Sequence, residues 1–278
     1  MTNTEHAQHT EKPILVVGGT GKTGRRVASR LADRGLPVRI GSRGGLPPFD
    51  WEKPETWPAV LEGVGAVYVT YYPDLAFPGA DEAVGAFAEA AVAAGARRLV
   101  LLSGRGEEGA VRSEERLKQS GADWTVVRAN WFAQNFSESF FRDPVLAGEL
   151  ALPVGDAVEP FVDADDIADV VVAALTDPRH TGRTYELSGP ELLGFHDVAA
   201  QLSAAIGRTV TYIPVTDAEY RAALAEHGLP GEFADLFALI TDGRNASVVH
   251  GVEEALGRPP RSFAAYTRDA AAAGAWKD

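Results

Sequence analysis

Cysteine is absent from this sequence of 278 residues, which excludes disulfide bonds, thiolate nucleophiles and cysteine-based zinc sites. The six histidines show no metal-ligand spacing, and His6 and His9 stand in a polar tail with few other ligands. We therefore predict no metal site. Long apolar runs are also missing, since no segment approaches the roughly 20 apolar residues of a membrane span, so we expect no membrane partner.

Basic side chains are outnumbered: 26 Lys and Arg stand against 39 Asp and Glu, which gives a net charge of −13. Such a surface repels the phosphates of nucleic acids, and we expect no nucleic-acid partner. Residues 1–12 lack the apolar core of a signal peptide. They are predicted to form a disordered tail on a cytoplasmic protein.

What the sequence does contain is an alternation of short β-branched apolar runs with helical patterns. The runs predict strands at residues 14–17, 38–40, 66–70, 99–102, 124–127 and 184–187. The spacing of apolar residues predicts helices around residues 27–32, 80–91, 113–120, 163–174 and 198–206. Repeated strand-helix units imply a parallel sheet covered by helices on both faces. The predicted fold class is α/β, a doubly wound parallel sheet of the Rossmann type.

Three glycines, Gly18, Gly21 and Gly24, follow the first predicted strand and precede a predicted helix. In that position glycine allows a tight turn and a close approach of a pyrophosphate to the helix N-terminus. An ordinary glycine-rich turn is the alternative. Lys22 after Gly21 also resembles the end of a P-loop, but Val16 stands where that motif requires glycine, so we exclude a nucleoside triphosphatase.

The end of the second predicted strand offers Gly41-Ser42-Arg43, with no acidic residue between Asp33 and Asp50. Proteins specific for NAD place Asp or Glu there to bind the ribose hydroxyls. Without that acid, Arg43 can bind the 2′-phosphate of NADPH through charge-assisted hydrogen bonds, and Ser42 can donate a neutral one. The alternative for Arg43 is a solvated loop arginine. We predict NADPH as the cofactor.

The strand-helix alternation thins after about residue 150, and residues 214–278 look mainly helical. We therefore expect an NADP(H)-binding Rossmann core at residues 13–155. A smaller, mainly helical C-terminal substrate-binding region is expected at residues 156–278, packed on that core. No internal repeat or long linker separates the two parts, so they are expected to share one cleft.

Several motifs together are similar to those of one family. They are the glycine loop, residues 41–43, Leu102-Ser103, residues 120–128, Asn135-Phe136 and residues 161–168. On these motifs the chain resembles the NmrA-like atypical short-chain dehydrogenases over roughly residues 13–265. Residues 49–51 and 131–136 look most like the reductases of ergot-alkaloid biosynthesis and their bacterial relatives. Membership implies the nicotinamide cofactor more firmly than it implies the reaction.

The resemblance implies roles for several residues around the cofactor. These are Thr20, Lys22 and Thr23 at the phosphates, Asp50 and Trp51 near the adenine, Thr70 and Tyr71 at the end of the third strand, and Leu102 and Ser103 on the nicotinamide side. Structural alternatives stay open for three of them. Asp50 would start a turn, Trp51 would belong to the core, and Ser103 would cap a loop.

For the substrate, the resemblance implies a wall that begins with Trp131, Phe132 and Asn135. Tyr71 and Tyr72 are expected to help these aromatic side chains cover an extended aromatic ring through stacking or cation–π contacts. The alternative is that aromatic residues at helical spacing belong to the core.

A catalytic Tyr-x-x-x-Lys dyad is missing, because no tyrosine has lysine four residues later. In ordinary short-chain dehydrogenases that lysine lowers the pKa of the tyrosine, so that the phenol passes a proton to the carbonyl oxygen. Ser103 likewise lacks the glycine two residues earlier that a serine hydrolase needs. We therefore predict an NADPH-dependent reductase of a small-molecule electrophile that is already activated: an iminium ion, a quinone or a conjugated alkene.

Two other classes of function stay open. The chain would be a non-catalytic NADP(H) sensor acting through a protein partner if the nicotinamide lacked an open, aromatic-lined cavity beside it. A cofactor-dependent isomerase or cyclase is the other class. A homodimer is expected from base rates alone.

Overall fold

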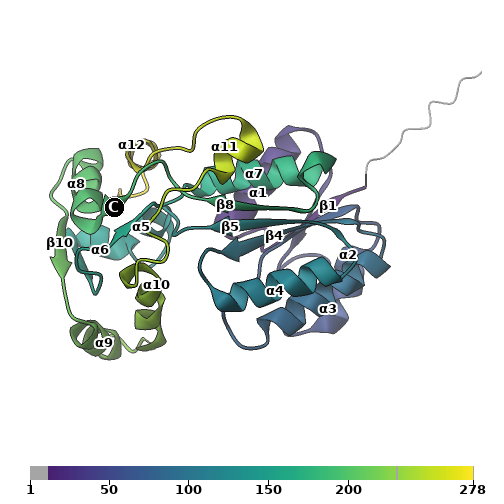
Figure 1. Ribbon diagram of the computed structural model, residues 1–278, viewed down its shortest axis with the longest axis horizontal. Helices are drawn as coiled ribbons and strands as arrows, with labels where there is room; N and C mark the ends of the chain where they lie inside the picture. Colours follow the sequence, from purple (N-terminus) through teal and green to yellow (C-terminus); the bar gives the residue numbers. More distant parts are fainter. Residues whose placement is uncertain (1–11, 230, 278) are drawn as a thin grey trace, which may run out of the picture.

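A central parallel sheet organises the protein, for which a computed structural model describes residues 12–229 and 231–277 (Figure 1). The sheet has six strands in the order β2-β1-β3-β4-β5-β8, and all neighbouring strands pair in parallel. The strands are β1 (Ile14–Val17), β2 (Val38–Gly41), β3 (Ala66–Val69), β4 (Arg98–Gly104), β5 (Asp123–Ala129) and β8 (Arg183–Leu187). The predicted Rossmann-type α/β class is confirmed.

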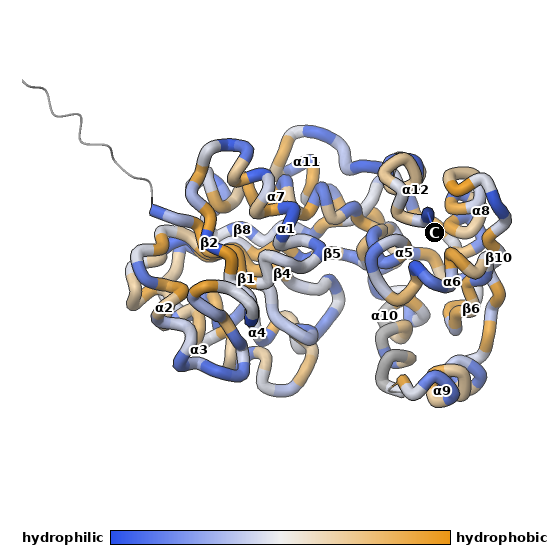
Figure 2. The backbone as a smooth tube through the Cα atoms, turned by 180° about the vertical axis from the view of Figure 1, so that it is seen from behind, coloured by the Kyte–Doolittle hydropathy of each residue, from blue (hydrophilic) through white to orange (hydrophobic). Residues whose placement is uncertain are grey.

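The strand order creates one topological switch point, between β1 and β3. From β1 the chain moves to β2 on one side and then crosses to β3 on the other side. Both β1 and β3 are apolar and buried along their length, as a strand covered on both faces requires, and Figure 2 shows β1 as a hydrophobic segment. In open α/β sheets, ligands bind outside the carboxyl ends of the strands at such a point.

Helices cover both faces of the sheet (Figure 1). One face is covered by α1 (Lys22–Asp33), α7 (Ala164–Thr176) and α11 (Gly251–Leu256). The other is covered by α2 (Trp57–Leu61), α3 (Ala80–Ala93) and α4 (Glu108–Gln119). Short 3-10 turns, η1 (Pro54–Thr56) and η2 (Pro178–His180), precede α2 and follow α7. Helix α4 begins at Glu108, earlier than predicted, and its Gly109 packs closely against the backbone of Ala76.

The remaining elements form a second unit, here called the C-terminal lobe (Figure 1). Its helices are α5 (Asn135–Glu138), α6 (Arg142–Ala147), α8 (Phe195–Ile206), α9 (Asp217–Glu226), η3 (Gly231–Phe237), α10 (Ala238–Thr241) and α12 (Phe263–Ala272). Its strands form two short pairs, β6 (Glu149–Leu152) with β10 (Thr211–Pro214) and β7 (Val158–Glu159) with β9 (Leu193–Gly194). Aromatic side chains fill its core, with Phe136 packed edge-on against Phe161 and Phe263.

The predicted boundary at residue 155 does not coincide with the two units. The sheet's sixth strand, β8, and the helix α7 lie beyond it, while α5, α6 and β6 lie before it in the C-terminal lobe. The chain returns to the sheet at β8, which pairs with β5 from Thr125 to Ala129. This strand supplies hydrogen-bond partners to the outer edge of β5, which would otherwise be exposed. The disordered tail predicted for residues 1–12 falls, apart from Lys12, outside the described residues.

Ion pairs join α1 to α7 across one face of the sheet. Arg30 Nε lies 2.6 Å from Asp169 Oδ1, and Arg30 Nη2 lies 2.6 Å from Asp165 Oδ1. The Asp163 side chain caps α7, since its carboxylate accepts the backbone N–H of Asp165. Within the described ranges no helix has the length and apolar character needed to cross a membrane.

We expect Phe87→Ala to destabilise the protein by about 3–5 kcal/mol, the usual cost of emptying a buried phenylalanine site. Phe87 is fully buried, and its ring meets those of Phe49, Trp51 and Trp57 at centroid distances of 5.5, 5.1 and 5.4 Å. Urea unfolding measures the change. Phe77→Ala is the control because Phe77 is 48% exposed, and equal losses for the two variants would contradict this core assignment.

Candidate active site

The glycine loop is built by backbone contacts that exclude side chains. Gly18 has φ +66°, a conformation that favours glycine, and a Cβ there would lie 2.4 Å from Thr70 Oγ1. A Cβ on Gly24 would lie 2.1 Å from the carbonyl oxygen of Gly18, so the first turn of α1 packs directly on the loop. Thr20 and Gly21 at its tip are exposed, and no side chain caps the N-terminus of α1. This open helix end fits a pyrophosphate.

Lys22 connects this loop to the C-terminal lobe. Its ammonium Nζ donates a hydrogen bond to Asn135 Oδ1 at 2.8 Å, which places Lys22 between the glycine loop and the wall predicted for the substrate. Burial lowers the pKa of Lys22, and Glu138 opposes that effect. Thr23 turns the other way: its hydroxyl is buried and accepts a hydrogen bond from the Tyr68 hydroxyl at 2.9 Å. The Thr23 side chain therefore packs α1 on the sheet.

Ser42 and Arg43 follow β2, on the loop that precedes Phe49. The Ser42 carbonyl accepts the backbone N–H groups of Gly45 and Phe49, which shapes this loop. Arg43 is exposed, and its guanidinium lies 5.9 Å from the centroid of the Tyr72 ring. Within residues 12–229 and 231–277 no ion-pair partner of Arg43 is found, so its charge is available to an anion. Tyr72 is 72% exposed and does not line the cavity described below.

Asp50 and Trp51 have structural partners. Asp50 Oδ1 accepts the backbone N–H of Glu52 at 3.1 Å, as expected of a residue that starts a turn. The Trp51 indole donates to the Thr70 carbonyl at 3.1 Å, and its ring is tilted against that of Tyr71 with centroids 5.0 Å apart. Trp51 is therefore part of the packing that positions the end of β3.

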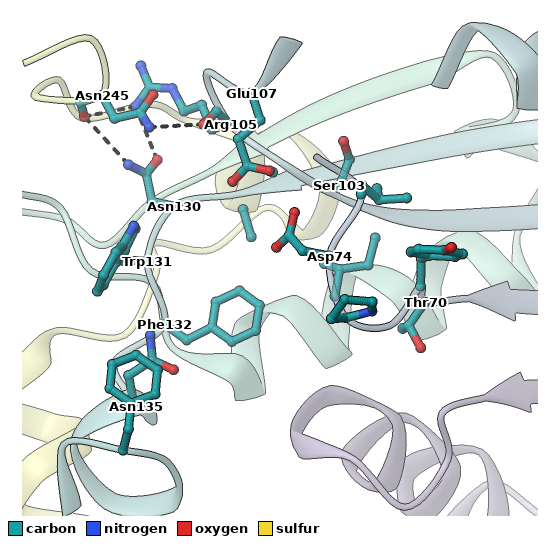
Figure 3. Close-up of a pocket in the computed structure, with 17 residues that line it drawn as sticks. Thr70, Asp74, Ser103, Arg105, Glu107, Asn130, Trp131, Phe132, Asn135 and Asn245 are labelled. Carbon is teal, nitrogen blue, oxygen red and sulfur yellow. Dashed lines mark hydrogen bonds between the residues drawn. The ribbon is translucent and has the colours of Figure 1, made fainter. Parts of the chain in front are cut away.

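A cavity of about 300 Å³ opens at the carboxyl ends of β3, β4 and β5 (Figure 3). The structure brings together in it seven of the predicted residues: Thr70, Tyr71, Leu102, Ser103, Trp131, Phe132 and Asn135. Trp131 also belongs to the packing of the lobe, since its ring is tilted against Phe237 with centroids 5.4 Å apart. The aromatic wall is thus both pocket lining and core.

Ser103 is held by a buried ion pair beneath the cavity. Its hydroxyl donates to Glu114 Oε1 at 2.7 Å, and Arg128 Nη2 donates to Glu114 Oε2 at 2.7 Å. Glu114 is fully buried, so Arg128 compensates its charge and the serine is fixed in place.

Sequence reasoning missed several polar residues that line the cavity. They are Asp74, Arg105, Glu107, Asn130 and Asn245. The first four follow the ends of β3, β4 and β5, and Asn245 lies on the loop before α11. Because ligands of open α/β sheets bind at the carboxyl ends of the strands, sequence reasoning could have identified the first four.

Asn130 is fixed in orientation by its neighbours. Its Nδ2 donates to Glu159 Oε1 at 2.7 Å. Its Oδ1 accepts from Arg105 Nη1 at 3.1 Å (Figure 3). Burial raises the pKa of Glu159 to about 6, while the hydrogen bonds from Asn130 and from the backbone of Trp131 oppose the rise. The far wall of the cavity is therefore a preformed hydrogen-bond network.

Comparison with known proteins agrees with this geometry. The model of the NmrA-like family matches residues 111–260. The NAD(P)H azoreductase of Xenophilus azovorans is 33% identical over 94% of this chain and 98% of that protein. The agroclavine dehydrogenase of Claviceps fusiformis is 32% identical over 92% of this chain and 96% of that protein. The structure of the Citrobacter sp. triphenylmethane reductase with NADP(H) has a TM-score of 0.73, 20% identity, and coverage of 93% and 99%.

Fold, glycine loop and relatives together define an oxidoreductase of the NAD(P)-binding Rossmann type, which confirms the predicted enzyme class. The chain belongs to the NmrA-like family. The resemblance found in its motifs, including the similarity to ergot-alkaloid reductases, is thereby confirmed.

We expect Gly21→Val to abolish dinucleotide binding and leave the protein folded. Gly21 has φ −79°, which valine adopts, and its Cβ would lie 3.2 Å from the Gly18 carbonyl oxygen, so only a small shift is needed. The valine methyl groups would occupy the space of the pyrophosphate. Circular dichroism reports the fold, and titration with NADPH and NADH reports binding.

Gly194→Val is the matched control. Gly194 precedes α8 as Gly21 precedes α1, has φ −73°, and its Cβ would lie 3.5 Å from its nearest neighbour, Asp197 Oδ2. This variant is expected to fold and to bind both dinucleotides normally. Normal binding by folded Gly21→Val would show that the loop is only a structural turn.

Proposed function

We propose that the protein is an NADPH-dependent reductase that transfers hydride to a small electrophile that is already activated, such as an iminium ion, a quinone or a conjugated alkene. The main supporting observation is the hydrogen bond from Lys22 to Asn135, because it joins the glycine loop to the aromatic wall of the cavity. A dinucleotide on the loop and a substrate in the cavity would then be neighbours. When bound, NADPH supplies a hydride ion from C4 of its nicotinamide.

The choice of NADPH over NADH rests on the end of β2. Arg43 is an exposed cation near the place where the ribose of a dinucleotide lies in a Rossmann fold, and Ser42 stands beside it. An acid at this position would repel a 2′-phosphate, whereas a guanidinium binds it through charge-assisted hydrogen bonds.

The class of substrate rests on the missing dyad. No lysine lines the cavity in the part of the chain that the structure describes, so a tyrosine of lowered pKa is not available there. An electrophile that already withdraws electrons needs less help, and catalysis depends on holding the acceptor about 3–3.5 Å from the nicotinamide C4. The relatives named for azo compounds, agroclavine and triphenylmethanes support this class.

A non-catalytic sensor is the second candidate function. The cavity argues against it. An open space of about 300 Å³ lined by Tyr71, Trp131 and Phe132 can hold a small molecule, and a protein that only reports the state of its dinucleotide does not require such a space.

We expect NADPH to bind more tightly than NADH by about 1–3 kcal/mol, the scale of hydrogen bonds to a charged group. Arg43→Ala removes this preference, and Arg34→Ala, which changes another exposed arginine at the far end of α1, keeps it. Calorimetric titration of both dinucleotides is the measurement. Equal affinities of the unmodified protein for NADPH and NADH would contradict the assignment of Arg43 to the 2′-phosphate.

Substrate class is tested by mixing protein and NADPH with cyclic iminium salts, quinones, enones and simple ketones, and following the nicotinamide absorbance. We expect turnover of one or more of the first three classes and none of the ketones, and 4-deuterated NADPH confirms that hydride is transferred. Rapid reduction of simple ketones would contradict the mechanism, and inertness toward all classes would favour the sensor.

A further inference from the structure

Two carboxyl groups face each other inside the cavity. Asp74 comes from the loop after β3, and Glu107 from the turn between β4 and α4, and Figure 3 shows the two groups pointing toward one another. The backbone N–H of Ala76 donates to Asp74 Oδ1 at 2.8 Å. Within the described residues neither carboxyl group forms an ion pair with lysine or arginine. Two unpaired carboxylates at close range repel each other, so the pair retains a proton.

Two glycines make this pairing sterically possible. A Cβ on Gly104 would lie 2.3 Å from Glu107 Cδ, so the Glu107 side chain folds back into space that a larger residue at position 104 would occupy. A Cβ on Gly109 would lie 2.5 Å from the Cα of Ala76, so α4 packs directly on the loop that holds Asp74. The pair is therefore a consequence of backbone packing on both sides.

We propose that Glu107, sharing its proton with Asp74, is the catalytic proton donor that accompanies hydride transfer in this cavity. The proposal rests on the reductase function proposed above and adds to it. It assigns a general acid to a site that lacks Tyr-x-x-x-Lys, and it adds azo compounds to the substrate class, because these, like quinones, develop negative charge on nitrogen or oxygen when hydride is added.

The surroundings keep Glu107 protonated near neutral pH. Burial raises the pKa of Glu107, and the neighbouring Asp74 raises it further, to about 8. The other charged groups on adjacent segments are Arg105, Glu108, Asp242 and Arg244. Arg105 is engaged by Asn130, Ser247 and Glu186. Arg244 binds Asp242 and the Gly106 carbonyl, and Glu108 is exposed.

With an azo compound or a quinone as acceptor, hydride forms a new bond at one end of the conjugated system, and the displaced π electrons move to a nitrogen or oxygen at the other end. The O–H bond of Glu107 breaks, and its proton forms an N–H or O–H bond there. Solvent returns a proton to the pair, so that substrate, NADPH and one proton give reduced substrate and NADP⁺. A cationic acceptor is different, because hydride alone makes it neutral.

This difference provides the experiment. Glu107→Gln removes the acidic proton, and Glu108→Gln is the matched control because it changes the adjacent exposed carboxylate. Both variants are compared with the unmodified protein on an azo dye or quinone, which needs a proton, and on a triarylmethane cation, which needs only hydride. We expect Glu107→Gln to lose about 10²–10⁴-fold in kcat on the first substrate. Glu107→Gln is expected to affect turnover of the cation far less than turnover of the first substrate, and Glu108→Gln to leave both unchanged.

The pH profile tests the same assignment without relying on one variant. Glu107 is protonated below its raised pKa, so turnover of the azo dye or quinone is expected to be constant below about pH 8 and to fall above it. The pH profile for turnover of the cation is expected to lack this decrease above about pH 8. Asp74→Asn removes the neighbouring negative charge and is expected to shift the decrease in azo-dye or quinone turnover to lower pH. Infrared titration of the protein without NADPH is expected to show a protonated carboxyl band that Glu107→Gln loses and Glu108→Gln keeps.

The outcomes separate the two proposals. If the unmodified protein reduces neither kind of substrate, the reductase function itself fails. If it reduces both and Glu107→Gln affects both equally, Glu107 is structural and the proton-donor proposal is overturned. If Glu107→Gln only raises KM for the cation, the pair is a cation-binding subsite, which overturns the proposal as well.

Discussion

The close packing of α1 on the glycine loop is the contact on which the rest of the site depends. Gly24 lies against the carbonyl group of Gly18 at a distance that leaves no room for a side chain. This contact fixes the axis of α1 and directs its uncapped N-terminus toward the carboxyl ends of β1 and β3, at the switch point of the sheet. Lys22, the first residue of the helix, is thereby placed within reach of Asn135.

The same helix holds the two units of the molecule together. Arg26 Nη2 lies 2.7 Å from Glu138 Oε1 of the lobe, and Arg25 pairs with the same carboxylate. Arg30 fixes α1 against α7 on the sheet through Asp165 and Asp169. Partly exposed ion pairs of this kind contribute little stability individually. Their effect on geometry is greater. They hold the lobe, and with it the substrate wall, against α1, the helix whose N-terminus a dinucleotide would contact.

Local patterns predicted the parts of the structure that depend on local chemistry. Gly18 and Gly24 were identifiable because only glycine allows their backbone contacts, and the strands because apolar β-branched runs mark them. The runs did not give every strand end, since β4 and β5 continue to Gly104 and Ala129, beyond the predicted residues 102 and 127. Thr23 was assigned to the phosphates, but its side chain is buried against Tyr68, which sequence spacing does not reveal. Asp74 and Glu107 were not predicted, because they are far apart in the chain and meet only through the packing of α4 on the loop after β3.

The missing dyad and the acid pair follow from one electrostatic requirement. A proton donor has to be protonated near neutral pH and still release its proton, so its pKa has to approach that pH. A phenol meets the requirement when a lysine lowers its pKa, whereas a carboxyl group meets it when burial and a second carboxylate raise its pKa. A chain with 39 Asp and Glu and five lysines favours the second route. A lysine close to Glu107 would lower the pKa of its carboxyl group and ionise it, so this acid pair depends on the absence of such a lysine from its surroundings.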